Sequence, residues 1–163
     1  MTEADKTHLR FALGWLELGD YASALEELDR IEAASRTEPE VLNLRWDIAI
    51  HAREYDSAVE AARLLTQIVP AQFEGWWKLS FVLHEMGRTQ EAYDNLASVL
   101  EQFSGEWLAH YNLACYLTRL ARLDEARVHL AKAFALNPDQ RRDALEDPDL
   151  EPLHAEIRRK PAS

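Results

Sequence analysis

The stretch YNLACYLTRLARLDEARVHLAKAFALNP, residues 111–138, decides the fold of this chain of 163 residues. Apolar side chains recur in it every three or four positions, which predicts two amphipathic helices. A short turn near Ala121 separates the two patterns, and Pro138 follows the second one, where a helix must stop. The stretch therefore predicts one helical hairpin.

The hairpin pattern occurs three more times towards the N-terminus, at a fixed spacing. Counting back from Ala126 in steps of 34 residues reaches three further alanines, Ala92, Ala58 and Ala24. A small residue fits these positions, because two antiparallel helices approach closely only where one of them presents a methyl group. Gly19 and Gly87 stand five residues before two of the alanines and suit the left-handed turn that ends a helix.

The period predicts that residues 1–138 contain four repeats, with boundaries at about 5–38, 39–72, 73–106 and 107–138. Residues 139–163 stand outside the period. There we expect a short helix, a turn, a second helix carrying Leu150, Leu153 and Ile157, and a frayed tail. This segment would cap the last hairpin, whose outer side the stack leaves uncovered. Only 5 glycines and 6 prolines are present, which favours an all-α fold.

The repeated pattern resembles the tetratricopeptide repeat family over about residues 5–138. In the third and fourth repeats, the residues that carry the resemblance are Trp76, Leu79, Ser80, Leu83, Gly87 and Ala92, then Leu113, Ala114, Leu117, Ala126, Ala133 and Pro138. The resemblance implies an all-α, right-handed superhelical solenoid of four antiparallel helix hairpins plus a C-terminal capping helix. The second repeat departs from the pattern, because Trp46 stands where the family prefers a small residue and Ala49 where it prefers a bulky one.

In this family the first helix of each repeat lines a concave face, which the resemblance makes the candidate partner-binding surface. The residues expected on it are Leu13, Asn43, Asp47, Trp77, Phe81, His84, Tyr111 and Cys115. Trp77, Phe81 and Tyr111 are the expected aromatic anchors, and we expect Trp77→Ala to weaken partner binding without loss of helicity. Two alternatives stay open: cover of these aromatic residues by the C-terminal segment or a neighbouring helix, and self-association.

The family's known clamp for a C-terminal carboxylate requires Lys and Asn where this chain has Leu9 and Leu13. Asn43 and Lys78 would form an incomplete clamp, and the neighbouring Asp47 would repel a carboxylate. The lining instead suits a protein or peptide partner that is apolar, aromatic or basic.

Charge and composition exclude several other functions. The net charge of −11, from 18 basic and 29 acidic residues, argues against nucleic acid and against an anionic membrane as partners. The six histidines show no metal-ligand spacing on one helix face, and the isolated glycines form no phosphate loop. We therefore expect no metal, no cofactor and no catalytic residues; Ser80 with His84, and Cys115, are interpreted as packing or lining residues.

A single cysteine, the absence of a signal-peptide pattern and the absence of a long apolar run predict a cytoplasmic protein. Taken with the resemblance, the sequence predicts a non-catalytic scaffold or adaptor that binds a partner segment in an apolar and aromatic groove. The alternatives are a secretion-type chaperone for a hydrophobic client segment and a regulatory subunit of an enzyme.

Overall fold

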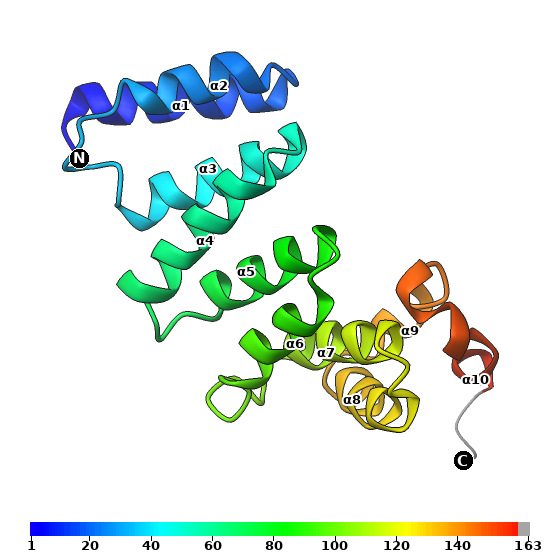
Figure 1. Cartoon of the computed structure of the whole chain (residues 1–163). Coiled ribbons are helices and arrows are strands. Elements are labelled where there is room, and N and C mark those ends of the chain that lie inside the picture. Colours follow the sequence, from blue (N-terminus) through cyan, green and yellow to red (C-terminus); the bar gives the residue numbers. More distant parts are fainter. Residues whose placement is uncertain (160–163) are drawn as a thin grey trace. The chain divides into compact units, whose positions relative to one another are not determined.

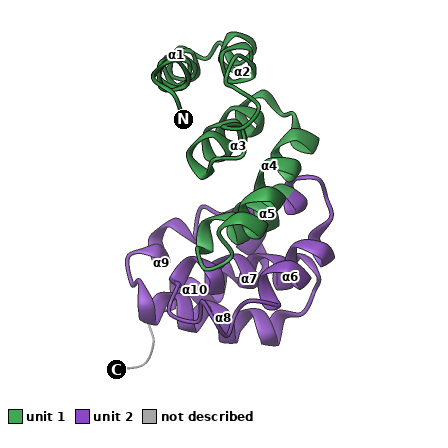
Figure 2. Cartoon of the chain, turned by 90° about the vertical axis from the view of Figure 1, so that its left-hand side faces the viewer, with its two compact units in different colours: residues 1–82 green, residues 83–163 purple. Residues whose placement is uncertain are grey.

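A computed structural model describes residues 1–159, and all regular secondary structure in that range is helical, as predicted. The last four residues of the predicted frayed tail lie outside the described residues. The chain divides into two compact units, Met1–Val82 and a second one from Leu83 onward (Figure 2).

The first unit contains four helices and most of a fifth (Figure 1), which are α1 (Glu3–Glu17), α2 (Tyr21–Asp29), α3 (Pro39–Ala52), α4 (Tyr55–Ile68) and α5 (Phe73–Glu85). α1 packs on α2 and α3 on α4, while α3 also contacts α1 and α2. Its core is apolar, with Leu28, Ile31 and Ile48 fully buried. The N-terminus of α1 is fixed by Asp5, which accepts hydrogen bonds from the Glu32 amide (2.9 Å) and the Ser35 hydroxyl (3.0 Å).

The second unit contains the end of α5 and the helices α6 (Thr89–Ala97), α7 (Trp107–Arg119), α8 (Leu123–Leu136), α9 (Gln140–Asp143), the 3₁₀ helix η1 (Pro148–Leu153) and α10 (His154–Arg158). α7 packs on α8, α6 contacts α7, and η1 lies against α7. The predicted second helix of the C-terminal segment is thus split into η1 and α10. Pro152 lies inside η1 and removes a backbone donor, which disfavours a continuous α-helix there.

The four alanines of the period, Ala24, Ala58, Ala92 and Ala126, are each 0% exposed. The turns that precede them share a left-handed residue. Gly19 and Gly87 both have φ of 76°, and the equivalent positions Arg53 and Ala121 have φ of 60° and 59°. A non-glycine residue in this region is strained by roughly 1 kcal/mol, so the turn geometry is maintained even where glycine is missing.

Gly75 on α5 marks a close approach of two helices in the first unit. A Cβ atom at this position would lie 2.9 Å from the Leu65 Cβ and 3.0 Å from the Thr66 backbone nitrogen, both on α4. Real Cβ atoms essentially never come so close to such atoms. Only glycine therefore allows α5 to lie against the backbone of α4.

We expect Gly75→Ala to lower the free energy of unfolding by about 1–3 kcal/mol, because the added methyl forces α4 and α5 apart. The measurement is urea denaturation followed by circular dichroism. Gly105→Ala is the matched control, since a Cβ at Gly105 would meet nothing within 4 Å. Equal stability of the two variants would contradict the close contact.

Candidate partner-binding surfaces

A hollow of about 490 Å³ lies between α1 and α3 in the first unit. Its lining residues are Leu9, Arg10, Leu13, Glu40, Asn43, Leu44 and Asp47. We call it the α1–α3 groove. Leu9 and Leu44 are 8% and 9% exposed and form its floor, whereas Leu13 on its wall is 47% exposed. The groove therefore presents apolar surface to solvent, and it brings together Leu13, Asn43 and Asp47, three of the residues predicted from the sequence.

The edge of the groove on α3 is acidic. Glu40 is exposed, and the side chain of Asp47, two turns further along α3, is 43% exposed. The basic residue in the lining is Arg10 on α1. A segment placed along α3 would therefore meet apolar floor and negative charge together.

Lys78 on α5 is 3% exposed and is held by polar groups of the same unit. Its Nζ atom donates a hydrogen bond to the Asn43 side-chain oxygen (2.9 Å) and forms ion pairs with Asp47 (3.3 Å) and Glu74 (3.2 Å). These partners compensate the cost of burying an ammonium group. Lys78 is thereby occupied inside the chain and does not point a free charge at a ligand carboxylate.

Three aromatic rings pack on one another, and two of them, those of Trp46 and Trp77, lie beside Lys78. The ring centroids of Trp46 and Trp77 are 5.4 Å apart, those of Trp46 and Phe81 5.9 Å, and those of Trp77 and Phe81 6.3 Å. The Lys78 Nζ lies 4.8 Å from the Trp46 ring centroid, a cation–π distance. Trp46, which breaks the repeat pattern, is only 5% exposed and acts as the centre of this cluster.

Trp77 and Phe81 are half-buried, so only part of each ring is available to a partner. The Trp77 ring also packs on Trp46 and Phe81, and its role as an aromatic anchor stays a prediction. Trp77→Ala would remove these internal contacts together with exposed surface. The side chain of Leu13 is more exposed, so a substitution at Leu13 tests binding with less effect on internal packing.

In the second unit the chain's own C-terminal segment covers two other predicted residues. Tyr111 and Cys115 are 9% and 5% exposed. The Tyr111 hydroxyl donates to the Asp147 carboxylate at 2.8 Å, and the Cys115 Sγ lies 3.7 Å from the same oxygen. Of the alternatives that the sequence left open, intramolecular cover applies to these residues. Their role as partner contacts stays a prediction.

Burial raises the pKa of the Cys115 thiol well above its ordinary value, and the nearby Asp147 carboxylate adds to the effect. The thiolate is the reactive form of cysteine. The position of Cys115 therefore fits a packing residue, as interpreted from the sequence, and does not favour a nucleophile.

The segment is held against α7 and the end of α5 by charged and apolar side chains. His84 Nε2 lies 2.8 Å from the Asp149 carboxylate, which is also 3.6 Å from the Arg119 guanidinium. The hydrogen bond with His84 is the main cause that lowers the pKa of Asp149. Leu150 and Leu153 are 0% and 1% exposed and fix the segment in place.

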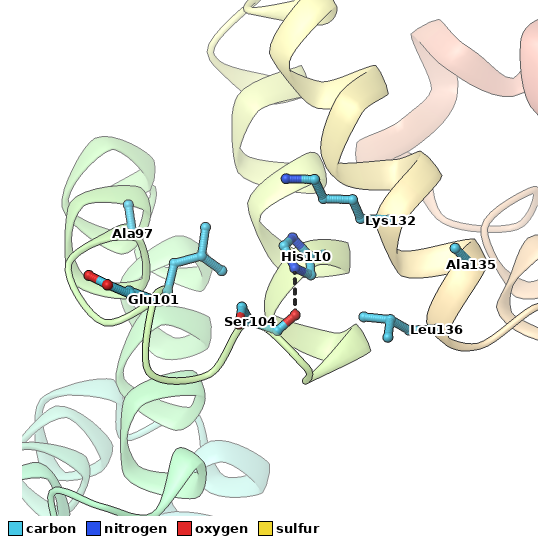
Figure 3. Close-up of a pocket in the computed structure, with 8 residues that line it drawn as sticks. Ala97, Glu101, Ser104, His110, Lys132, Ala135 and Leu136 are labelled. Atoms are coloured by element: carbon cyan, nitrogen blue, oxygen red, sulfur yellow. Dashed lines mark hydrogen bonds between the residues drawn. The ribbon is translucent and has the colours of Figure 1, made fainter.

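A second hollow, of about 680 Å³, lies between α8 and the segment from Ala97 to Ser104 (Figure 3). His110 lies at its base and is 3% exposed. Its Nε2 lies 3.0 Å from the Ser104 carbonyl oxygen, and its Nδ1 lies 3.0 Å from Nδ1 of His129 (Figure 3 draws the bond to Ser104). Because a carbonyl only accepts, His110 Nε2 carries a proton, and between the two Nδ1 atoms one ring donates to the other.

This histidine pair was missed from the sequence, because its members are 19 residues apart and lie on different helices. Burial lowers the pKa of His129 to about 4, and His110 and Lys132 add to the effect. The pair joins α7 to α8. No cluster of three metal-ligating side chains occurs anywhere in residues 1–159.

Residues 109–140 match the family described as tetratricopeptide repeat. The chain carries a tetratricopeptide repeat. The match coincides with α7, α8 and the start of α9, the part of the sequence in which the resemblance was strongest. A comparison with curated protein sequences finds no significant match.

Several solved structures share this tetratricopeptide fold. MamA 41-end from Desulfovibrio magneticus RS-1 has a TM-score of 0.77 at 18% identity, with 96% of this chain and 90% of that chain covered. The structure named MamA MSR-1 C2 has a TM-score of 0.70 at 22% identity, with coverages of 83% and 78%. The structure named MamA AMB-1 P212121 has a TM-score of 0.69 at 23% identity, with 82% of this chain and 73% of that chain covered. At these identities the likeness shows the fold, an all-α helical solenoid.

The tetratricopeptide repeat and its fold support a protein-interaction scaffold.

None of the helices in the described part of the chain is long and apolar enough to cross a membrane.

Leu150→Ala is expected to speed the reaction of Cys115 with a thiol reagent by roughly 10-fold, because the cavity loosens the segment that covers it. The rate is followed by absorbance of the released thiolate. Leu136→Ala on α8, where the side chain is 47% exposed, is the control and should leave the rate unchanged. A native Cys115 that reacts as fast as in the denatured chain would contradict the described cover.

His129→Gln is expected to reduce the loss of stability on acidification. The folded-state pKa of His129 is about 4, below the unfolded value of 6.5, so the unfolded chain binds more protons between these values. The stabilising contribution of neutral His129 is thus complete above pH 6.5 and is lost as the pH falls towards 4. Its size is on the order of 1 kcal/mol, because the group is partly solvated.

The measurement is the thermal midpoint of wild type and His129→Gln at pH 7.5 and pH 5. The midpoint of the variant should fall by a few degrees less than that of wild type. The comparison at pH 7.5 separates any packing defect from the titration. An equal fall in both proteins would contradict the assignment.

Proposed function

We propose that residues 1–82 bind a segment of a partner protein in the α1–α3 groove, without catalysis. An apolar side chain of the partner sits between Leu13 and Leu44, and basic side chains beside it face Glu40 and Asp47. This binding mode is a specific form of the general scaffold role that the tetratricopeptide fold supports.

The observation that carries the proposal is the open apolar wall at Leu13. This side chain is 47% exposed although its neighbours in the lining, Leu9 and Leu44, are nearly buried. Concave apolar surface beside a few polar groups is typical of a site where a ligand replaces water. The polar groups here are Asn43, Glu40 and Asp47.

Charge supports a basic partner. Acidic residues outnumber basic ones by 29 to 18 in the chain, so an acidic partner would be repelled and a basic one attracted at long range. Close to the groove, Glu40 is exposed on the edge, whereas Asp47 forms an ion pair with Lys78. Charge complementarity of this kind sets specificity and association rate more than affinity.

The test is selection of 12-residue peptides from a display library, followed by fluorescence anisotropy of the recovered peptides. We expect peptides in which Leu, Phe or Trp is flanked by Lys or Arg. Leu13→Glu should weaken their binding by about 10-fold or more, since it places a charge on the apolar wall. Glu40→Lys should weaken basic peptides and reduce the salt dependence of binding.

Val128→Glu is the matched control, because Val128 is 54% exposed on α8 and belongs to the second unit. It should leave affinity unchanged. Recovery of purely apolar peptides that bind equally well to Glu40→Lys would favour the chaperone alternative. Peptides whose affinity is unaffected by Leu13→Glu would overturn the proposed groove.

A further inference from the structure

α1 carries a second apolar face, separate from the groove. Phe11, Trp15 and Leu18 are 56%, 39% and 76% exposed. Their spacing of four and three residues places them on one side of the helix. The buried residues Leu9 and Ala12 lie on another side, packed into the core of the unit.

Gly14 lies within this exposed face, in the interior of α1. A Cβ atom there would meet nothing within 4 Å, so no contact inside the chain requires glycine. Glycine weakens a helix interior relative to alanine. Gly75 differs in this respect, because the neighbouring helix leaves no room there for a Cβ atom. Glycine also allows the backbone of another molecule to approach a helix closely. No helix of the same unit uses Gly14 in this way, so its exposed side is available to a partner.

A hollow of about 390 Å³ surrounds Gly14, and its lining residues are Arg10, Phe11, Gly14, Trp15, Leu18 and Glu27. Glu27 is already paired with His8 and Arg30. The hollow is thus formed mainly by α1 itself, with aromatic and aliphatic walls around the glycine.

The charges that flank the face complement each other. Arg10 and Glu17 are exposed, and within residues 1–159 neither has an ion-pair partner; Arg10 donates only to the Thr7 hydroxyl. They are seven residues apart, which places them on the same flank of α1. Gly14 lies close to the midpoint between them. When two copies of such a helix pack antiparallel, equivalent flanks meet, so each Arg10 faces the Glu17 of the other copy.

We propose that this face is a self-association surface, on which α1 of a second copy of the chain packs antiparallel across Gly14. The arrangement has twofold symmetry, in which the same patch serves both partners. It buries Phe11, Trp15 and Leu18 and forms two Arg10–Glu17 ion pairs between copies. Because this face carries one basic and one acidic residue, it can pair with the same face of a second copy. The acidic edge of the α1–α3 groove would repel its own copy.

The test is sedimentation equilibrium of the full chain between about 10 µM and 1 mM, since a small interface gives weak association, with a Kd on the order of 100 µM. Phe11→Asp should raise the Kd at least 10-fold. Val128→Asp, an equally exposed apolar position on α8, is the matched control and should leave it unchanged. Circular dichroism of each variant shows that the monomer is folded.

A charge exchange tests the antiparallel register. Arg10→Glu and Glu17→Arg alone should each raise the Kd about 5-fold, and the double variant should return it to within about 2-fold of wild type. Gly14→Ala should raise the thermal midpoint of the monomer, because alanine favours the helix, and yet weaken the dimer.

A chain that is monomeric at 1 mM overturns the proposal, as does a dimer that is insensitive to Phe11→Asp or is not restored by the double exchange. Leu13→Glu should leave the dimer intact. The self-association surface and the peptide groove can therefore fail independently.

Discussion

Close contact between paired helices at a buried alanine is the constraint on which the rest of the structure depends. The alanines that recur at 34-residue spacing are all inaccessible to solvent. A larger side chain at any of them would separate the two helices, since the interaxial distance follows the side chains at the contact. Because this contact fixes the second helix of each pair, the first helix keeps a free side. The α1–α3 groove is formed on that side.

The two units use this free side differently. In the first unit the groove is bordered by Glu40 and Asp47 and left open at Leu13. In the second unit the equivalent helix, α7, is covered by an acidic and apolar segment of the chain, in which Asp147 meets Tyr111. One framework thus provides both an open surface and a surface sealed by its own C-terminal segment.

The sequence predicted what depends on local periodicity and failed where distant segments meet. The helical pairs followed from apolar spacing, and Leu13, Asn43 and Asp47 followed from their phase in the repeat. Cover of Tyr111 by the C-terminal segment was one of several alternatives that the sequence left open, because it depends on how the chain turns between Asp143 and Pro148, outside the period. The His110–His129 pair and the contact at Gly75 likewise depend on how helices pack against each other. The spacing of residues along a single sequence does not reveal such contacts between helices.

Binding in the α1–α3 groove is tested most directly by an ¹⁵N-amide NMR titration of the chain with a basic, leucine-containing peptide recovered by the display selection. We expect the largest chemical-shift changes to cluster around Leu13, Asn43 and Asp47, on α1 and α3. Changes centred instead on the Phe11, Trp15 and Leu18 face, or on residues of the second unit, would contradict this expectation.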